Sequence, residues 1–273
     1  MRERARGAAG RANLKRLSLF AKGNLDVRDS LHSLRLGGEL RWNGINSLLR
    51  EQGGDCTIRV RHETAIGSLP LARAAGTVPE LFADRALPLG HYPLATQFSD
   101  ALFQTPADAY VLSIQADVQI GLVRHRRDGF LFHPPELASW PADERQWLQA
   151  EFEPCGLPDP ATALSDLAAV VERLRATTAA PILIYNLSSI VPGETVHCHA
   201  GMEDIVSTRI KRFNLGLVEL SQRSGVSIID VDRIVAEHGQ HALKLDTTHL
   251  TEAGCRAVAG EVLRVLDDYG LLQ

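Results

Sequence analysis

The stretch ATALSDLAAVVERLRATTAAPILIYNL, residues 161–187, contains the two sequence patterns that decide the fold. In ALSDLAAVVERLRA, apolar residues recur at positions i, i+3, i+4 and i+7, which is typical of a helix that buries one face. PILIYNL, at 181–187, is an almost continuous apolar run, as expected for a strand that helices cover on both faces. A helix joined to such a strand predicts a parallel sheet with crossover helices.

The same alternation of strand and helix patterns recurs on both sides of this stretch. Apolar runs rich in β-branched residues predict strands at 17–22, 57–63, 109–115, 181–187 and 226–231. Helical patterns occur at 29–36, 45–52, 143–152, 161–178, 204–225 and 251–270. This order predicts an α/β protein with three layers, α/β/α, around a central, mainly parallel sheet. We find no repeat, low-complexity linker or clear domain boundary, and therefore expect one α/β domain over residues 17–273.

The composition argues against several classes of protein. A net charge of -4 and a pI near 6.2 differ from the basic character of nucleic-acid-binding proteins. No apolar run is long enough to span a bilayer, and no phosphate-binding or dinucleotide motif indicates a cofactor. Residues 1–16 are basic and lack the apolar segment of a secretory signal, so we expect a flexible tail. The four cysteines lack CxxC spacing, which favours reduced thiols in a cytoplasmic protein.

Candidate site residues follow the predicted strands, because ligands of parallel α/β sheets bind outside the carboxyl ends of the strands. Gly23, Asn24 and Asp26 follow the first strand, Gly67 follows the second, and Asp117 follows the third. We predict that these five residues contact the substrate.

The segment KLDTTHLTEAGCRAVAGEVLRVL, residues 244–266, supplies the most specific motif. Asp246 and His249 stand three residues apart before a helix that Thr251 can cap. A nearby carboxylate fixes the tautomer of a histidine and raises its basicity, which suits a general base. The alternative interpretation is an exposed loop histidine beside a capping carboxylate.

This segment also carries a resemblance to a known family. DTTHLTEAG, followed by an amphipathic helix, resembles the last block of the SGNH (GDSL-type) hydrolases, in which an Asp-x-x-His loop supplies two members of a catalytic triad. PILIYNL and SGVSIIDVDRIVAEHG resemble the family's late strand-helix-strand unit, and AYVLSIQADV resembles the strand that carries its third block. The resemblance implies an SGNH- or flavodoxin-like fold. It also implies acyl transfer through a serine nucleophile and an oxyanion hole.

The sequence departs from the family in its first and third blocks. One alignment places the family's Gly-Asp-Ser on Gly23-Asn24-Leu25, where Leu25 has no nucleophilic atom. A second alignment uses the literal Asp-Ser-Leu at 29–31 and makes Ser30 the nucleophile, although Ser30 is also a suitable helix N-cap. In the third block, the family expects Gly-x-Asn where this chain has Gln-Ala-Asp at 115–117. An ionised Asp117 cannot donate a hydrogen bond to an oxyanion.

Three hypotheses follow from this resemblance. The first is a hydrolase or acyltransferase for a small-molecule or carrier-bound ester or thioester, in which Ser30 attacks, His249 is the base and Asp246 orients it. The second is an enzyme of the same fold without a serine nucleophile, with a site built on Asp26, Asp29 or Asn24. The third is a binding or accessory protein that has lost the site.

The sequence also offers two alternatives in which a metal is bound. Oxygen ligands from Asp26, Asp29 and Asp117 would suit a divalent cation if these carboxylates converge. His197, Cys198 and His199 lie close to Glu194, but no second ligand pair with suitable spacing accompanies them, so we interpret this segment as an ordinary loop. Neither the oligomeric state nor the substrate follows from the sequence, and we predict a site without metal or cofactor.

Overall fold

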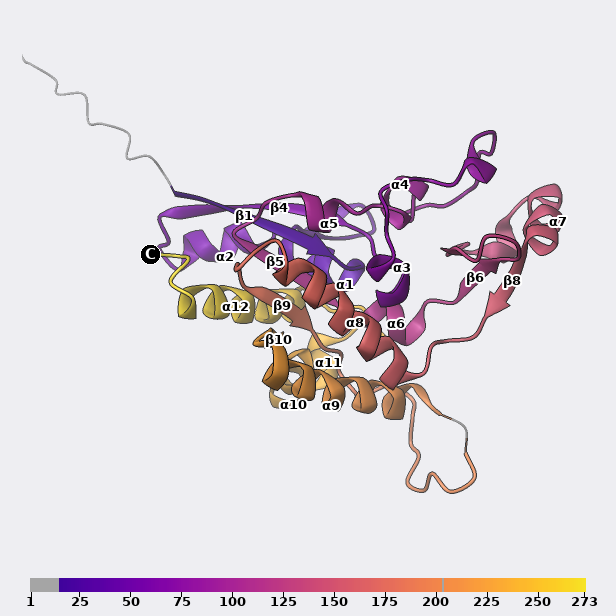
Figure 1. Cartoon of the computed structure of the whole chain (residues 1–273). Coiled ribbons are helices and arrows are strands. Elements are labelled where there is room, and N and C mark those ends of the chain that lie inside the picture. Colours follow the sequence, from indigo (N-terminus) through magenta and orange to yellow (C-terminus); the bar gives the residue numbers. More distant parts are fainter. Residues whose placement is uncertain (1–14, 203) are drawn as a thin grey trace, which may run out of the picture.

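The computed structural model describes residues 15–202 and 204–273, so most of the predicted basic tail lies outside the described residues. A five-stranded sheet occupies the centre (Figure 1). Its strands are β1 (Lys15–Lys22), β4 (Cys56–Glu63), β5 (Ala109–Ser113), β9 (Ile182–Tyr185) and β10 (Ser227–Ile229). They run in the order β10-β9-β5-β1-β4, and every pair of neighbours is parallel. The predicted fold class and the five predicted strands are confirmed.

Helices cover both faces of this sheet. Since successive side chains of a strand point to opposite faces, each strand packs against both layers of helices. In β1, Leu19 and Ala21 belong to one hydrophobic cluster and Phe20 belongs to another. The first cluster includes α1 (Leu25–Leu31), α2 (Ile45–Glu51), α10 (Val231–His238), α11 (Gln240–Leu243) and α12 (Glu252–Asp268). The second includes α3 (Ser68–Ala72), α5 (Ala101–Gln104), α8 (Pro160–Arg175) and α9 (Val206–Ser224). The strands are therefore buried on both sides, which explains their apolar sequences.

The ends of the long helices follow from capping residues in the sequence. Asp159 precedes α8 and accepts hydrogen bonds from the N–H groups of Ala161 and Thr162. Thr251 accepts from the N–H of Gly254 at the start of α12, as predicted. At the end of α9, Gly225 adopts a φ of 66°, a left-handed conformation that glycine takes at little cost.

The prediction of one helix over residues 29–36 was wrong. Helix α1 starts at Leu25 and ends at Leu31, and β2 (Leu34–Leu36) then pairs with β3 (Glu39–Trp42) in an antiparallel hairpin. The turn between these strands contains Gly37 and Gly38, whose φ values of 57° and 84° favour glycine. Eight residues were too few to distinguish a helix from a turn followed by a strand. Strand β1 also begins at Lys15, inside the predicted tail.

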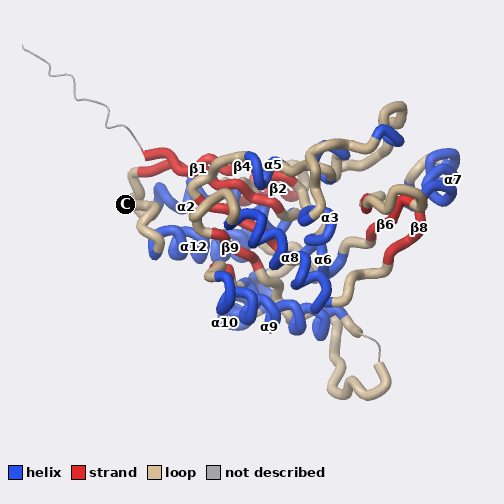
Figure 2. Tube along the Cα trace, viewed as in Figure 1, coloured by secondary structure: helices blue, strands red, loops and turns tan. Residues whose placement is uncertain are grey.

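Two segments form a part of the structure of which the sequence revealed only one helix, predicted at 143–152. Residues 73–107 contain η1 (Glu80–Phe82), α4 (Leu94–Gln97) and α5, and α6 (Gln115–Gln119) precedes the second segment, 121–158. The second segment contains β6 (Leu122–His125), β7 (Leu131–Phe132), η2 (Leu137–Ser139), α7 (Ala142–Glu151) and β8 (Phe152–Cys155). Figure 2 shows β6, β8 and α7 at a distance from the central sheet. The two segments share a hydrophobic cluster that includes Phe82, Leu89, Phe132, Trp140, Leu148 and Phe152.

Gln97 joins these two segments through its buried amide. The Nε2 group donates to the carbonyl oxygens of Tyr92 at 2.8 Å and His133 at 3.0 Å. Oε1 accepts from the N–H of His133 at 2.9 Å. Because a buried polar group without a partner is costly, this side chain adds to the hydrophobic cluster in holding residues 73–107 against residues 121–158.

Replacement of Gln97 should therefore loosen the joined segments while leaving the central sheet intact. In Gln97→Ala, three main-chain groups lose their partners, and we expect local stability to fall by about 2–4 kcal/mol. Hydrogen exchange read by mass spectrometry should show faster exchange in residues 73–107 and 121–158 only. Gln104→Ala is the matched control, because its exposed amide makes one contact, 3.4 Å from Asp100. Equal exchange rates in the two variants would contradict this role of Gln97.

Candidate active site

The turn after β1 is held closely by its neighbours. The N–H of Gly23 donates to the carbonyl oxygen of Glu63 at 3.1 Å. A Cβ atom on Gly23 would lie 2.6 Å from Cγ2 of Val27, so a larger residue would force the turn apart. His62 Nε2 lies 2.9 Å from the Gly23 carbonyl oxygen, and this nitrogen must carry the proton because a carbonyl only accepts. Burial lowers the pKa of His62 to about 4, which keeps the ring neutral at pH 7.

Asp26 connects the ends of three strands. Its carboxylate accepts hydrogen bonds from the N–H of Asn24, at 3.2 Å, and from the hydroxyl of Ser113 at the end of β5. The side chain of Asn24 accepts from the N–H of Ala65, beyond the end of β4, at 3.3 Å. Asp26 is 7% exposed, and burial raises the pKa of its carboxyl despite these hydrogen bonds. The neutral form of the carboxyl is therefore favoured relative to an aspartate in water.

Ser30 lies in the interior of the protein. The residue is 0% exposed, and its hydroxyl lies 2.8 Å from the carbonyl oxygen of Asp26 and 3.1 Å from the Tyr185 hydroxyl. His249 is not among its hydrogen-bond partners in the described part of the chain. Ser30 is also no helix cap, because α1 begins five residues earlier. This placement argues against attack by Ser30, since a nucleophile must reach its substrate.

Asp246 and His249 are brought together as the sequence predicted. His249 Nδ1 lies 2.6 Å from one carboxylate oxygen of Asp246, and the other oxygen accepts from the N–H groups of His249 and Thr248. Burial by itself would raise the pKa of Asp246, but these hydrogen bonds and the histidine more than offset it, so the pKa is lowered. With its proton on Nδ1, facing the carboxylate, the ring presents a free lone pair on Nε2. The pair can act as an oriented general base.

The loop that carries this pair shares a cavity with the residues after β1. An antiparallel bridge between Lys244 and Leu250 closes the loop. The cavity is small, and its lining includes Asp26, Tyr185, Asn186, Ser188, Lys244, Thr247 and Thr248. Lys244 donates to the carbonyl oxygen of Ile190 at 2.7 Å, and burial lowers its pKa to about 8. Residues from the two ends of the chain thus face each other across this cavity.

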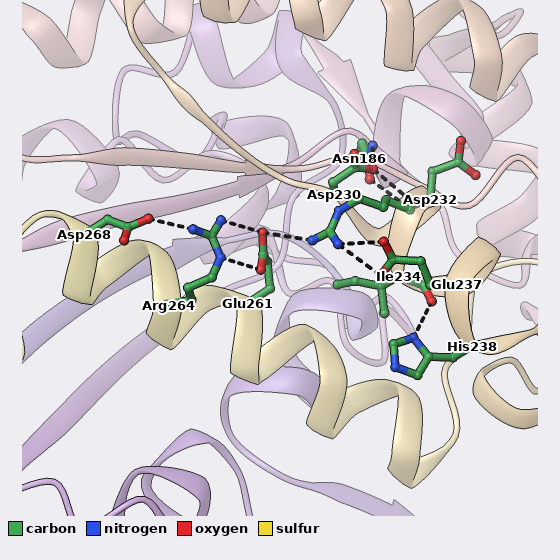
Figure 3. A network of polar contacts seen from close by, with 10 residues as sticks. Asn186, Asp230, Asp232, Ile234, Glu237, His238, Glu261, Arg264 and Asp268 are labelled. Atoms are coloured by element: carbon green, nitrogen blue, oxygen red, sulfur yellow. Dashed lines mark hydrogen bonds and ion pairs between the residues drawn. The ribbon is translucent and has the colours of Figure 1, made fainter.

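A polar network fixes the loop after β9, which forms one wall of the cavity. The Asn186 amide donates to Asp230 at 2.7 Å and accepts from the N–H of Asp232 at 3.2 Å. Asp232 in turn accepts from the N–H of Ser189 at 2.7 Å. Figure 3 shows that the network continues into α12, to which Glu261 and Arg264 belong.

Asp117 is bonded to the turn after β4. Its two oxygens accept from the N–H of Ser68 at 2.7 Å and from the Ser68 hydroxyl at 2.6 Å. Gly67 adopts a φ of 141°, and a Cβ atom there would lie 3.2 Å from Asp117. Burial raises the pKa of Asp117 to about 6. Through these contacts, Asp117 fixes the turn after β4.

Gln115, which the sequence alignment matched to the glycine of the family's third block, is connected with Asp26 through Ser113. Strand β5 ends at Ser113, Ile114 follows, and Gln115 is the first residue of α6. The N–H of Gln115 donates to Ser113 Oγ at 3.0 Å, which connects it with Asp26. The side chain is buried, and its Oε1 has no partner among the described residues. The sequence could have indicated Gln115 as a site residue, since its amide lies two residues beyond the end of β5. The predicted strand, 109–115, extended too far and included this residue.

The carboxylates proposed as a cation site do not share a ligand position. Asp26 is bonded to Ser113, Asp117 to Ser68, and Asp29 to Arg28 at 2.7 Å. Within residues 15–202 and 204–273, no three His, Cys, Asp or Glu side chains are grouped so that they could hold a metal ion. Nor does any helix of this described part have the length and apolar character needed to cross a membrane.

Comparison with known proteins establishes the fold. No family model and no curated protein matches this chain. Among solved structures, LAE5, an alpha/beta hydrolase enzyme from the metagenome of Lake Arreo, Spain, is 15% identical with a TM-score of 0.51, over 94% of this chain and 96% of its own. The acetyl xylan esterase AlAXEase is 12% identical with a TM-score of 0.50, over 92% and 100%. At such identities the likeness shows a shared fold, and this is the fold that the SGNH resemblance implied.

The raised pKa of Asp117 leads to a prediction about stability. A group whose pKa is higher in the folded state binds more protons there, so its stabilising effect is lost as pH rises through that pKa. A rise from 3.8 to about 6 corresponds to about 3 kcal/mol, lost between about pH 4 and pH 7. Asp117→Asn cannot titrate, so the stability of the wild type relative to this variant should fall by about that amount over this range.

Urea unfolding at several pH values measures this difference. Asp84→Asn serves as the control, because Asp84 is exposed and its removal should leave the pH dependence unchanged. A constant difference between the wild type and Asp117→Asn from pH 4 to pH 7 would show that Asp117 ionises normally.

Proposed function

We propose that this protein hydrolyses an ester or thioester, or transfers its acyl group, with His249 as general base and without a serine nucleophile. The observation that carries the proposal is the bonded Asp246–His249 pair in a loop whose Thr247 and Thr248 line the same cavity as Asp26, while the hydroxyl of Ser30 is buried in the core. This is the second of the three hypotheses drawn from the sequence. The small-molecule or carrier-bound acyl substrate remains part of the proposal.

The proposed nucleophile is a water molecule or the hydroxyl of an acceptor. Nε2 of His249 removes the proton of this group as its oxygen attacks the carbonyl carbon, and a tetrahedral oxyanion forms. The oxyanion then collapses, the bond to the leaving oxygen or sulfur breaks, and the imidazolium returns the proton to the leaving group. Asp246 holds the ring and stabilises its charged form during the reaction.

Amide groups at the strand ends supply the donors for the oxyanion. The side chains of Asn24 and Gln115 follow β1 and β5. Oδ1 of Asn24 accepts from the N–H of Ala65, and the main-chain N–H of Gln115 donates to Ser113. Removal of one such donor typically costs about 3 kcal/mol of transition-state stabilisation.

The named activities of structurally similar proteins support the choice of substrate class. LAE5 is described as a hydrolase and AlAXEase as an acetyl xylan esterase. Those descriptions apply to those proteins, and an ester is accordingly the first substrate to test on this one.

Replacement of His249 should abolish turnover of a simple ester. With p-nitrophenyl acetate, we expect kcat/KM of His249→Ala to fall by about 10²–10⁴-fold, the usual contribution of general acid–base catalysis. His238→Ala is a matched control from the surface of α10 and should behave as the wild type. Ser30→Ala, checked for folding by circular dichroism, should retain activity.

A fluorophosphonate probe provides the complementary measurement. Because the proposed reaction has no serine ester intermediate, the probe should leave Ser30 unlabelled while turnover proceeds. Labelling of Ser30, with loss of turnover in Ser30→Ala, would restore the serine mechanism. Wild-type turnover in His249→Ala would remove the general base from the proposal.

A further inference from the structure

Tyr92 is carried to the ends of the central strands by residues 73–107. Its half-buried ring packs against a cluster formed by Ala65, Ala116 and Ile120. Ala65 lies beyond the end of β4 and Ala116 beyond the end of β5. The N–H of Ala65 donates to Asn24, and Ala116 is the neighbour of Gln115, so Tyr92 borders both proposed oxyanion donors.

The segment that carries Tyr92 is anchored to the sheet beside the site. Lys22, the last residue of β1, is 3% exposed and donates to the carbonyl oxygen of Thr96 at 2.7 Å. The same ammonium group pairs with Glu63, the last residue of β4, at 3.2 Å. The hydroxyls of Thr64 and Thr96 lie 2.9 Å apart. This part of the segment is therefore fixed relative to two strand ends.

The ring of Tyr92 is also oriented from the second segment. It meets the ring of His133 edge-on, with centroids 4.8 Å apart, and Gln97 bonds the main chains of both residues. The Tyr92 hydroxyl has no hydrogen-bond partner in the described part of the chain. Burial raises the pKa of this phenol, and the charge of Asp26 acts in the same direction.

We propose that Tyr92 is a catalytic residue whose hydroxyl donates a hydrogen bond to the carbonyl oxygen of the acyl substrate beside Asn24 and Gln115. The inference rests on the proposed function and adds a residue from outside the strand-end loops. A phenol that is already held in place loses little conformational freedom when it binds the substrate. It also keeps its proton throughout the neutral pH range. The ligand that matches an oriented, unpartnered donor is an oxygen that gains negative charge during the reaction.

Removal of this hydroxyl alone should lower the rate of the chemical step. For p-nitrophenyl acetate, we expect kcat of Tyr92→Phe to fall by about 10–100-fold while KM changes less than about threefold, because the bond strengthens in the transition state. Tyr269→Phe is the matched control, since this exposed hydroxyl contacts Ser227 at the start of β10. A wild-type kcat in Tyr92→Phe would overturn the proposal.

A titration of the phenol tests the same placement without turnover. Tyrosines labelled with ¹³C at Cζ can be followed by NMR, and Tyr92→Phe identifies the resonance. The pKa of Tyr92 should lie above that of free tyrosine and should fall in Asp26→Asn, because a negative neighbour is removed. Asp84→Asn should not move it. An unchanged Tyr92 titration in Asp26→Asn would overturn the placement of Tyr92 beside these strand ends.

The two proposals fail in different ways. Turnover that depends on His249 but not on Tyr92 would overturn only the role of Tyr92. An inactive wild type, tested on acyl esters and thioesters, would overturn the proposed function and this role together.

Discussion

The buried carboxyl of Asp26 is the contact on which the candidate site depends. It accepts hydrogen bonds from the N–H of Asn24 and the hydroxyl of Ser113, and so connects the turn after β1 with the end of β5. Asn24 extends the connection to Ala65, beyond β4. Three neighbouring parallel strands therefore present their polar ends in one fixed arrangement. A carboxyl at this point stays buried only because these donors replace the water that it has lost.

Two further parts of the chain complete the site around this centre. The loop between Lys244 and Leu250 brings the Asp246–His249 pair, which is local in sequence and needs only its own hydrogen bonds. The segments 73–107 and 121–158 bring Tyr92 and His133 and are joined through Gln97. Their shared aromatic cluster and the bond between Lys22 and Thr96 hold them together and beside the sheet. The strands thus provide the base of the site, and the added segments provide its border.

Sequence reasoning succeeded where structure depends on neighbours along the chain. The strand at 181–187 and the helix at 161–178 were recognised because apolar spacing alone indicates which faces are buried. The Asp246–His249 pair was recognised for a similar reason, since three residues separate its members. Reasoning from the sequence was less successful at 29–36, where a short apolar pattern suited a helix and a hairpin equally. It also missed the small sheet of 121–158, whose strands are only two to four residues long.

The sequence by itself determined a parallel α/β sheet and a histidine oriented by a carboxylate. Only the tertiary structure decided the roles of the remaining polar residues. Ser30 is an apparent nucleophile in the sequence, but the start of α1 at Leu25 turns it into the core. Asp117 is engaged by Ser68, and Gln115 follows the true end of β5. The physical reason is that burial and hydrogen-bond partners come from residues distant along the chain, and these set whether a polar group is available for chemistry.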